Sequence, residues 1–275
     1  MDGSSLLKSI LALASLCCVV APRAAQAQGV ADHVAMGVAA MHAHDLRTGL
    51  AHYEAGLGLD SASYEANWRA AMALLDLGEQ ISDSAKSPER DSLFARAETL
   101  ARRAVAADSG RAEGHFALAA AVGRASLTMG KKDRIRRAPV IRDAARRAIA
   151  LDPRHDGAYH VLGRWHAEIM RLSGFSRFFA RSFLGAGIFK EASWDSAAAN
   201  LEKAVELDPA RIYHRLELAE VYADRKRYDE ARAQLAKVDA LPRRELRDSA
   251  YQADALSLAE RIADKRQRHQ TQTRD

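Results

Sequence analysis

The sequence predicts an all-α protein in which pairs of helices stack into a right-handed solenoid. Composition supports this, because alanine, the strongest helix former, is abundant while aromatic residues make up only 6% of the chain. Residues that interrupt helices are scarce, with 16 glycines and 6 prolines among 275 residues. The third observation is a repeated phrase, in which an apolar helix end is followed by Asp and then Pro or Ser. Such a phrase ends one helix and caps the next.

The repeated phrase divides the chain into units. It ends at four positions, Ser61, Ser109, Pro153 and Pro209. We therefore expect five helix pairs, over residues 30–63, 64–110, 111–154, 155–210 and 211–243. A final amphipathic helix over Arg244–Lys265 should cap the solenoid, because Leu246, Ala250, Ala253 and Leu256 recur at helical spacing. The helical domain would occupy residues 28–267, followed by a flexible polar tail over 268–275.

The fourth pair has the clearest repeat signature. Its first helix has Tyr159, Leu162, Gly163, Trp165 and His166, and its second has Ala197, Leu201, Ala204 and Pro209. This pattern resembles the tetratricopeptide repeat (TPR), a pair of helices with a 34-residue period. The last three phrases lie 44 and 56 residues apart, so the third and fourth units are longer than this period. Register places 22 extra residues between the two helices of the fourth pair, and we expect an inserted helix there.

Three further segments resemble the regulator of microtubule dynamics family. They are Trp68-Arg-Ala-Ala-Met, Glu113-Gly-His-Phe116 and Leu162-Gly-Arg-Trp165, the last with a long insertion after it. The resemblance covers most of residues 60–260. It implies a helical repeat domain without catalytic machinery. It also implies association with microtubules and, in one branch, organelle tethering and phospholipid binding by the repeat domain.

The first 27 residues resemble a secretory signal peptide. Lys8 precedes an apolar run over residues 10–21, and Ala25-Gln-Ala27 is a cleavage signal that would give a mature start at Gln28. The run is too short for a transmembrane helix, although an uncleaved anchor stays an alternative. We therefore expect an exported protein, periplasmic or secreted, to which the family's microtubule role would not apply. Cleavage would also remove both cysteines of the chain.

Two basic segments are candidates for binding. Residues 171–190 contain five of the seven phenylalanines, interleaved with arginines, and residues 131–147 have a net charge of +6. An amphipathic insertion could hold an apolar ligand or contact anionic lipid, or it could simply pack on the solenoid. The basic stretch suggests an anionic partner or a solvated helix face. The candidate binding residues are Arg134, Arg136, Arg137, Phe175, Arg177, Phe179, Arg181 and Phe183.

Other chemistry has little support in the sequence. No pair of histidines has metal-ligand spacing on a helix, and no glycine-rich loop or nucleophile elbow is present. The acids Glu217 and Glu220 lie three residues apart on a helix, where we expect them to be exposed. The tryptophans are expected in the core, with Trp165 and Trp194 supporting the insertion. We expect no metal, no cofactor and no nucleic-acid partner.

Three functional hypotheses follow. The first is a non-enzymatic exported scaffold whose concave groove binds a protein or extended peptide, which the basic centre predicts to be acidic. The second is a module that binds phospholipid or another apolar ligand through residues 171–190, and it requires an apolar cavity beneath them. The third, an enzyme with a composite site, requires buried acids or histidines with shifted pKa values that converge in one pocket.

Overall fold

The computed structural model describes residues 26–81, 86–172 and 190–272, and throughout these ranges the regular elements are helices. A first helix spans residues 26–42. It is followed by α2 (Leu46–Leu59), α3 (Tyr64–Glu79), α4 (Pro88–Ala107), α5 (Ala112–Leu127), α6 (Lys131–Leu151), α7 (Asp156–Arg171), α10 (Trp194–Leu207), α11 (Ile212–Asp224), α12 (Tyr228–Ala240) and α13 (Asp248–Gln272). No helix in the described part of the chain is long and apolar enough to cross a membrane.

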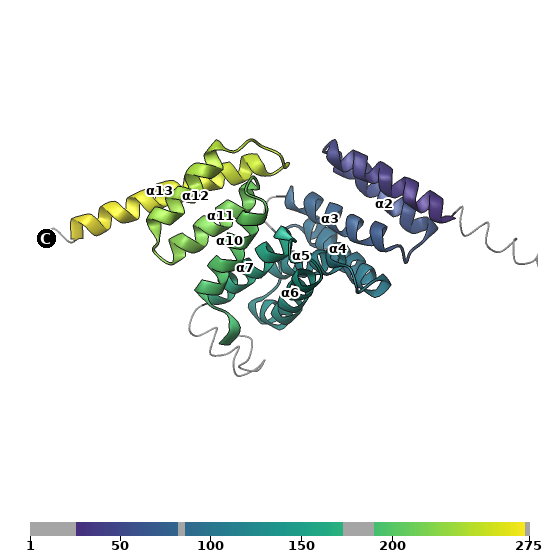
Figure 1. Cartoon of the computed structure of the whole chain (residues 1–275), viewed down its shortest axis with the longest axis horizontal. Coiled ribbons are helices and arrows are strands. Elements are labelled where there is room, and N and C mark those ends of the chain that lie inside the picture. Colours follow the sequence, from purple (N-terminus) through teal and green to yellow (C-terminus); the bar gives the residue numbers. More distant parts are fainter. Residues whose placement is uncertain (1–25, 82–85, 173–189, 273–275) are drawn as a thin grey trace, which may run out of the picture.

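Consecutive helices pack as antiparallel pairs, and the pairs follow one another from α2 to α13 (Figure 1). The five predicted pairs and the capping helix are confirmed. One hydrophobic cluster runs from α2 to α7, and a second joins α7 to α13. α13 begins at Asp248 rather than Arg244 because the Asp248 carboxylate accepts the backbone N–H groups of Arg244 and Glu245, both at 2.7 Å, in the turn before the helix.

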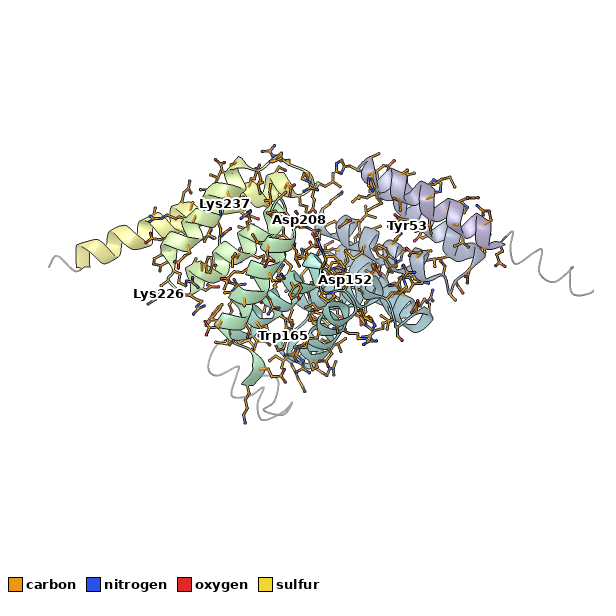
Figure 2. All side chains as sticks on the ribbon, viewed as in Figure 1. Tyr53, Asp152, Trp165, Asp208, Lys226 and Lys237 are labelled. Atoms are coloured by element: carbon orange, nitrogen blue, oxygen red, sulfur yellow. The ribbon has the colours of Figure 1, made fainter. Side chains whose placement is uncertain are left out.

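The aspartates of the repeated phrase end helices α2, α4, α6 and α10. Each one has its backbone N–H bonded to the carbonyl four residues earlier, and its carboxylate accepts the N–H two residues later at 2.8–3.1 Å. These aspartates are Asp60, Asp108, Asp152 and Asp208, the last two labelled in Figure 2. The expectation that the phrase also caps the next helix was wrong, because those helices begin after Ser63, Arg111, His155 and Arg211. The phrase therefore works as a helix stop followed by an Asx turn.

Close approach of paired helices depends on glycine in the first helix. A Cβ atom on Gly163 of α7 would lie 2.7 Å from Leu201 Cγ and 3.1 Å from the backbone of α10. Gly163 and Leu201 are both buried, so this contact confirms the register deduced for the fourth pair. Small residues at such crossings allow the helices to interlock at short distance.

The insertion lies where the register predicts it. α7 ends at Arg171 and α10 begins at Trp194, so residues 172–193 separate the two helices of the fourth pair. The inserted helix expected around residues 171–190 falls almost wholly on 173–189, outside the described residues. The extra length of the third unit lies in α6 itself, which has 21 residues and contains Pro139 in its interior.

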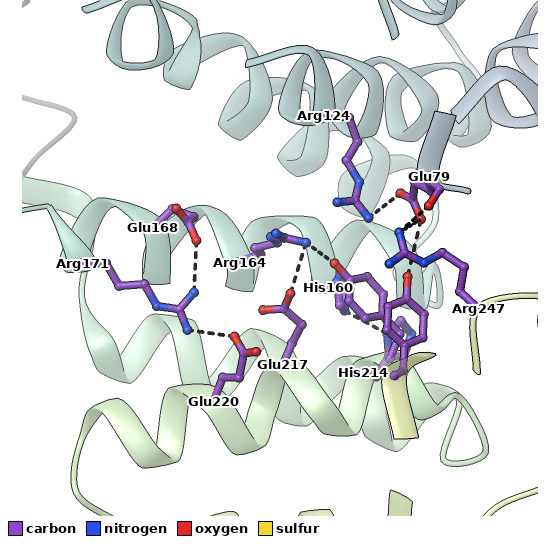
Figure 3. Close-up of polar contacts among 12 residues, drawn as sticks. Glu79, Arg124, His160, Arg164, Glu168, Arg171, His214, Glu217, Glu220 and Arg247 are labelled. Carbon is purple, nitrogen blue, oxygen red and sulfur yellow. Dashed lines mark hydrogen bonds and ion pairs between the residues drawn. The ribbon is translucent and has the colours of Figure 1, made fainter. Parts of the chain in front are cut away.

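The end of the solenoid returns to contact its second pair. Arg247, just before α13, donates to the Glu79 backbone carbonyl at 2.8 Å, and the Tyr251 hydroxyl lies 3.4 Å from a Glu79 carboxylate oxygen. We call these contacts of Arg247 and Tyr251 with Glu79 the clasp (Figure 3). Repeats of a solenoid ordinarily contact only their neighbours. The clasp therefore shows that the inner helices curl around a common centre.

Candidate functional site

A cavity of about 270 Å³ lies at this common centre, and we call it the central cavity. It is lined by α3, α5, α7 and α11, the first helices of four consecutive pairs, together with α6 and the segment that leads into α13. An engineered apolar cavity of about 150 Å³ is enough to admit benzene. The central cavity is therefore large enough for a small organic ligand.

One end of the central cavity is apolar. Its lining includes Ile135 and Ile141 of α6 and Trp165, Ile169 and Leu172 at the end of α7. The Trp165 indole N–H donates to the Ala138 carbonyl at 2.8 Å, so its polar atom is satisfied within the protein. This end offers hydrocarbon contacts without polar groups in need of a partner.

The opposite end is polar and densely ion-paired. Arg124 forms an ion pair with Glu79, and Arg211 contacts Asp156 at 3.1 Å and Glu245 at 3.0 Å. Arg164 contacts Glu217 at 3.1 Å and donates to the Tyr213 hydroxyl (Figure 3). Burial disfavours the Arg164 charge, but Glu217 and Tyr213 outweigh it and raise the Arg164 pKa. These arginines keep their charge inside the protein because carboxylates neutralise them.

Two histidines form a buried chain beside this polar end. His214 Nε2 lies 2.8 Å from the Asp156 carboxylate, and His214 Nδ1 lies 2.9 Å from His160 Nδ1. If His214 donates from Nε2 to Asp156, its Nδ1 accepts from His160, so the lone pair of His160 is on Nε2. Burial lowers the pKa of both histidines, and the positive charge of Arg164 lowers that of His160 further. Both rings are therefore neutral at pH 7.

Asp76 differs from the other carboxylates that line the central cavity. Burial, with added repulsion from Glu79 and Glu245, raises the pKa of Asp76 to about 7. Among the described residues, no hydrogen bond or ion pair involves its carboxyl group. Arg211 and Arg124 attract it only from a distance and do not restore an ordinary pKa.

A second polar network joins α7 to α11. Arg171 contacts Asp224 at 2.8 Å, Glu168 at 3.0 Å and Glu220 at 3.3 Å (Figure 3). The expected exposure of the acid pair was wrong for Glu217, which is 5% exposed. Burial and the nearby Glu217 raise the pKa of Glu220. α11 is packed on several sides at once, which places polar side chains in the interior.

The predicted binding residues are only partly brought together. Arg134 lines the central cavity and contacts Glu168 at 3.1 Å. Arg137 pairs with Glu98 and donates to the Ser126 hydroxyl at 3.1 Å, while Arg136 points outward beside Asp133 at 2.9 Å. The other five predicted residues lie outside the described residues, namely Phe175, Arg177, Phe179, Arg181 and Phe183.

The repeat positions predicted for the fourth pair lie in α7, in α10 and in the turn after α10. Most of them are buried in α7 and α10, and this set comprises Leu162, Gly163, Trp165, Ala197, Leu201 and Ala204. Tyr159 is half-buried, and Pro209 is exposed in the turn, where its carbonyl accepts from Arg215 at 2.9 Å. No group of three or more potential metal ligands occurs among the residues described here.

The polar end was missed by sequence reasoning. Its groups come from positions as distant as Asp76 and Tyr251, and only the curl of the solenoid brings them together. One local signal was available: Met72, Leu75, Asp76 and Glu79 recur at helical spacing along one face of α3. Two acids on an otherwise apolar inner face point to a polar pocket.

The fold and the central cavity define a TPR-like helical repeat protein with a partly open pocket on the inner face of its helices. The model of the family "Regulator of microtubule dynamics protein 1-3" matches residues 40–263, and the chain belongs to this family. A comparison with curated proteins found no match.

Solved structures similar to this chain include TPR proteins. The thermophilic TPR protein TTC0263 of Thermus thermophilus is 21% identical, with a TM-score of 0.58 over 82% of this chain and 98% of that one. PilF of Pseudomonas aeruginosa is 13% identical, with a TM-score of 0.49 over 87% and 90%. YrrB, described as a TPR protein with an unusual peptide-binding site, is 16% identical, with a TM-score of 0.44 over 84% and 90%. The likeness to TTC0263 establishes the fold.

Proposed function

We propose that this protein binds a ligand with a hydrocarbon chain, such as the acyl chain of a lipid, inside the central cavity. The observation that carries the proposal is the cavity itself, about 270 Å³ and apolar at one end. Ligand pockets are typically concave and mostly apolar, with a few polar groups that fix orientation. The central cavity has this composition, with apolar side chains around Trp165 and polar ones around Asp76.

The position of the cavity also supports this proposal. A lipid-binding module requires an apolar cavity beside residues 171–190, and Leu172, the residue that follows α7, is part of the lining of the central cavity. The clasp bridges the inner face from α13 to α3. A bridged cavity suits a compact ligand better than an extended peptide, which needs a groove open along its length.

Native mass spectrometry of the full chain, purified gently from its expression host, tests the proposal. We expect an excess mass that is lost on organic extraction. The blocking variant is Gly123→Phe, because Gly123 lines the central cavity and a Cβ atom there would meet nothing within 4 Å. Gly123→Ala is the matched control, since it changes the same backbone position but adds only one methyl group.

The two variants separate binding from folding. Gly123→Phe should remain helical by circular dichroism yet carry no excess mass, while Gly123→Ala should carry the same mass as the parent chain. A bare mass for all three proteins would contradict the proposal. An excess mass retained by Gly123→Phe would place the ligand elsewhere.

A protein or peptide partner is the second candidate. Leu127 and Met129 are 39% and 37% exposed at the turn between α5 and α6, and Arg136 is exposed on α6. Exposed apolar residues and a nearby exposed cation in the sequence are features that an acidic partner could cover. If the purified chain is bare, crosslinking from Arg136 and the lysines of this turn becomes the experiment of choice.

Localisation and chemistry complete the proposal. We propose that residues 1–27 direct export of the chain to the periplasm or to the outside of the cell. Export would separate the protein from tubulin, so a microtubule role is the third candidate.

We also propose that the protein is not an enzyme. A composite active site needs buried histidines and acids, which this protein has, and a nucleophile in contact with one of these bases. Among the described residues, the ring nitrogens of His160 contact His214 and no nucleophile.

A further inference from the structure

The cations that line the central cavity are already neutralised. Arg124 pairs with Glu79, Arg134 with Glu168, Arg164 with Glu217, and Arg211 with both Asp156 and Glu245. An anionic ligand group would have to displace one of these carboxylates. Displacement would leave a charge without its partner in a poorly solvated site, which is costly.

Asp76 is the exception among the charged groups that line the cavity. The other lining carboxylates are those of Glu79, Glu168 and Glu245, and each contacts an arginine. Asp76 lies on the inner face of α3, with Met72 and Leu75 beside it in the lining, and makes no hydrogen bond or ion pair with any described residue. The cavity thus offers an apolar surface and, among its carboxylates, one without a protein partner; the neutral His160 ring in the same lining also has an unpartnered nitrogen, Nε2, but carries no charge to attract a cation.

We propose that the ligand of the central cavity is an amphiphile with a protonated amine at its polar end, and that the Asp76 carboxylate binds this amine. This inference rests on the proposed function, because it assumes that a hydrocarbon chain occupies the cavity. The hydrocarbon would lie against Trp165 and Ile169, and the ammonium group would supply the partner that Asp76 lacks. A charge-assisted hydrogen bond of this kind is about twice as strong as a neutral one.

The electrostatic surroundings of Asp76 favour a cation over an anion. Glu79 from its own helix and Glu245 from the segment before α13 repel its negative charge, while Arg124 of α5 and Arg211 before α11 attract it. Tyr53 of α2 is also within electrostatic range. Together with burial, these groups leave the pKa of Asp76 at about 7. A bound ammonium group would favour the ionised carboxylate and lower this pKa.

Calorimetric titration of the full chain with three eight-carbon probes tests the proposal. Octylamine, octanol and octanoate share a hydrocarbon chain and differ in the polar group. At pH 8 we expect octylamine to bind most tightly and octanoate most weakly. Asp76→Asn keeps the size of the side chain but removes its charge, and it should weaken octylamine binding about tenfold or more while leaving octanol unchanged. Asp229→Asn, on an 81% exposed side chain of α12, is the matched control.

The outcomes separate this inference from the proposed function. If the three probes bind equally, or octanoate binds best, the amine assignment is overturned while the apolar cavity stands. If none of the three binds, both are overturned. The parent chain provides an independent readout that needs no variant: octylamine affinity should fall as pH drops from 8 to 5, because Asp76 becomes protonated, whereas octanol affinity should not. Octylamine affinity that is flat over this range would also contradict a role for Asp76.

Discussion

Replacing two glycines by alanine tests the helix packing on which the solenoid depends. Gly163 of α7 lies against α10, and an added Cβ would lie 2.7 Å from Leu201 Cγ and 3.1 Å from both the Ala197 carbonyl oxygen and the Leu201 backbone nitrogen. Gly123 of α5 faces the open central cavity, where an added Cβ would contact nothing within 4 Å. The two substitutions are chemically identical and differ only in what the methyl group meets.

The magnitude follows from this difference. In a helix interior, alanine is favoured over glycine by about 1 kcal/mol, and this gain applies at both positions. At Gly163 the methyl group overfills a packed contact, and such overpacking costs about 1–3 kcal/mol. Leu201 is fully buried, and two of the three contacted atoms are backbone, so the site has little room to yield. We therefore expect Gly123→Ala to stabilise the chain, and Gly163→Ala to be less stable than Gly123→Ala by about 1–3 kcal/mol.

Urea unfolding followed by circular dichroism measures this difference directly. The denaturant midpoint of Gly163→Ala should lie below that of Gly123→Ala, with the same slope of unfolding free energy against urea concentration. Equal midpoints for the two variants would refute the packing argument. They would show either that α7 and α10 are not in the register described here or that the contact relaxes freely.

Three further predictions concern charged and titratable groups. Glu79→Gln should lower the free energy of unfolding by about 1.5–3 kcal/mol, because the clasp and the contact with Arg124 lose their charge, and hydrogen exchange should be faster at the start of α13. Asp76→Asn should raise the free energy of unfolding at pH 8 but not at pH 4, because the folded chain binds a proton at Asp76 below about pH 7 whereas the unfolded chain does so only near pH 4. Burial lowers the pKa of His166 to about 4, so its contribution to stability is complete above pH 6.5 and is lost as pH falls toward 4. His166→Gln should flatten the fall of stability between these pH values, and an unchanged profile would contradict this assignment.

The helix pairs could be predicted from sequence because their signals are local. Each aspartate at a helix end acts through its own backbone and the residues next to it. The register of the fourth pair needed only the spacing of Gly163 and Leu201, which the repeat fixes. Such short-range chemistry recurs in every unit, so a periodic pattern reveals it.

The charge arrangement could not be predicted in the same way. The basic stretch over residues 131–147 has a high net charge along the chain, but neighbouring helices bring carboxylates to it. Glu98 of α4 pairs with Arg137, Glu168 of α7 with Arg134, and Glu191 with Arg142 and Arg146. A charge sum along the sequence does not include partners that arrive from other elements. An acidic partner for this stretch stays a prediction.

The apolar residues around Glu217 indicate that it is buried, although helical periodicity alone does not. Leu216 and Leu218 flank it, and apolar residues recur on nearly every side of α11. A helix that is apolar all round is packed on several faces, so its polar residues are buried as well. The clasp had no such signal, because Glu79 and Arg247 are 168 positions apart and meet only through the curl of the whole solenoid.

Photolabelling tests most directly whether the central cavity is a ligand site. The full chain would be irradiated with an alkyl diazirine probe, and the labelled residues would be mapped by mass spectrometry, with octylamine as competitor. We expect labels at Ile135, Trp165 and Ile169, which the competitor removes and which Gly123→Phe abolishes. Labels confined to exposed apolar residues such as Met36 and Leu256, insensitive to the competitor, would contradict it.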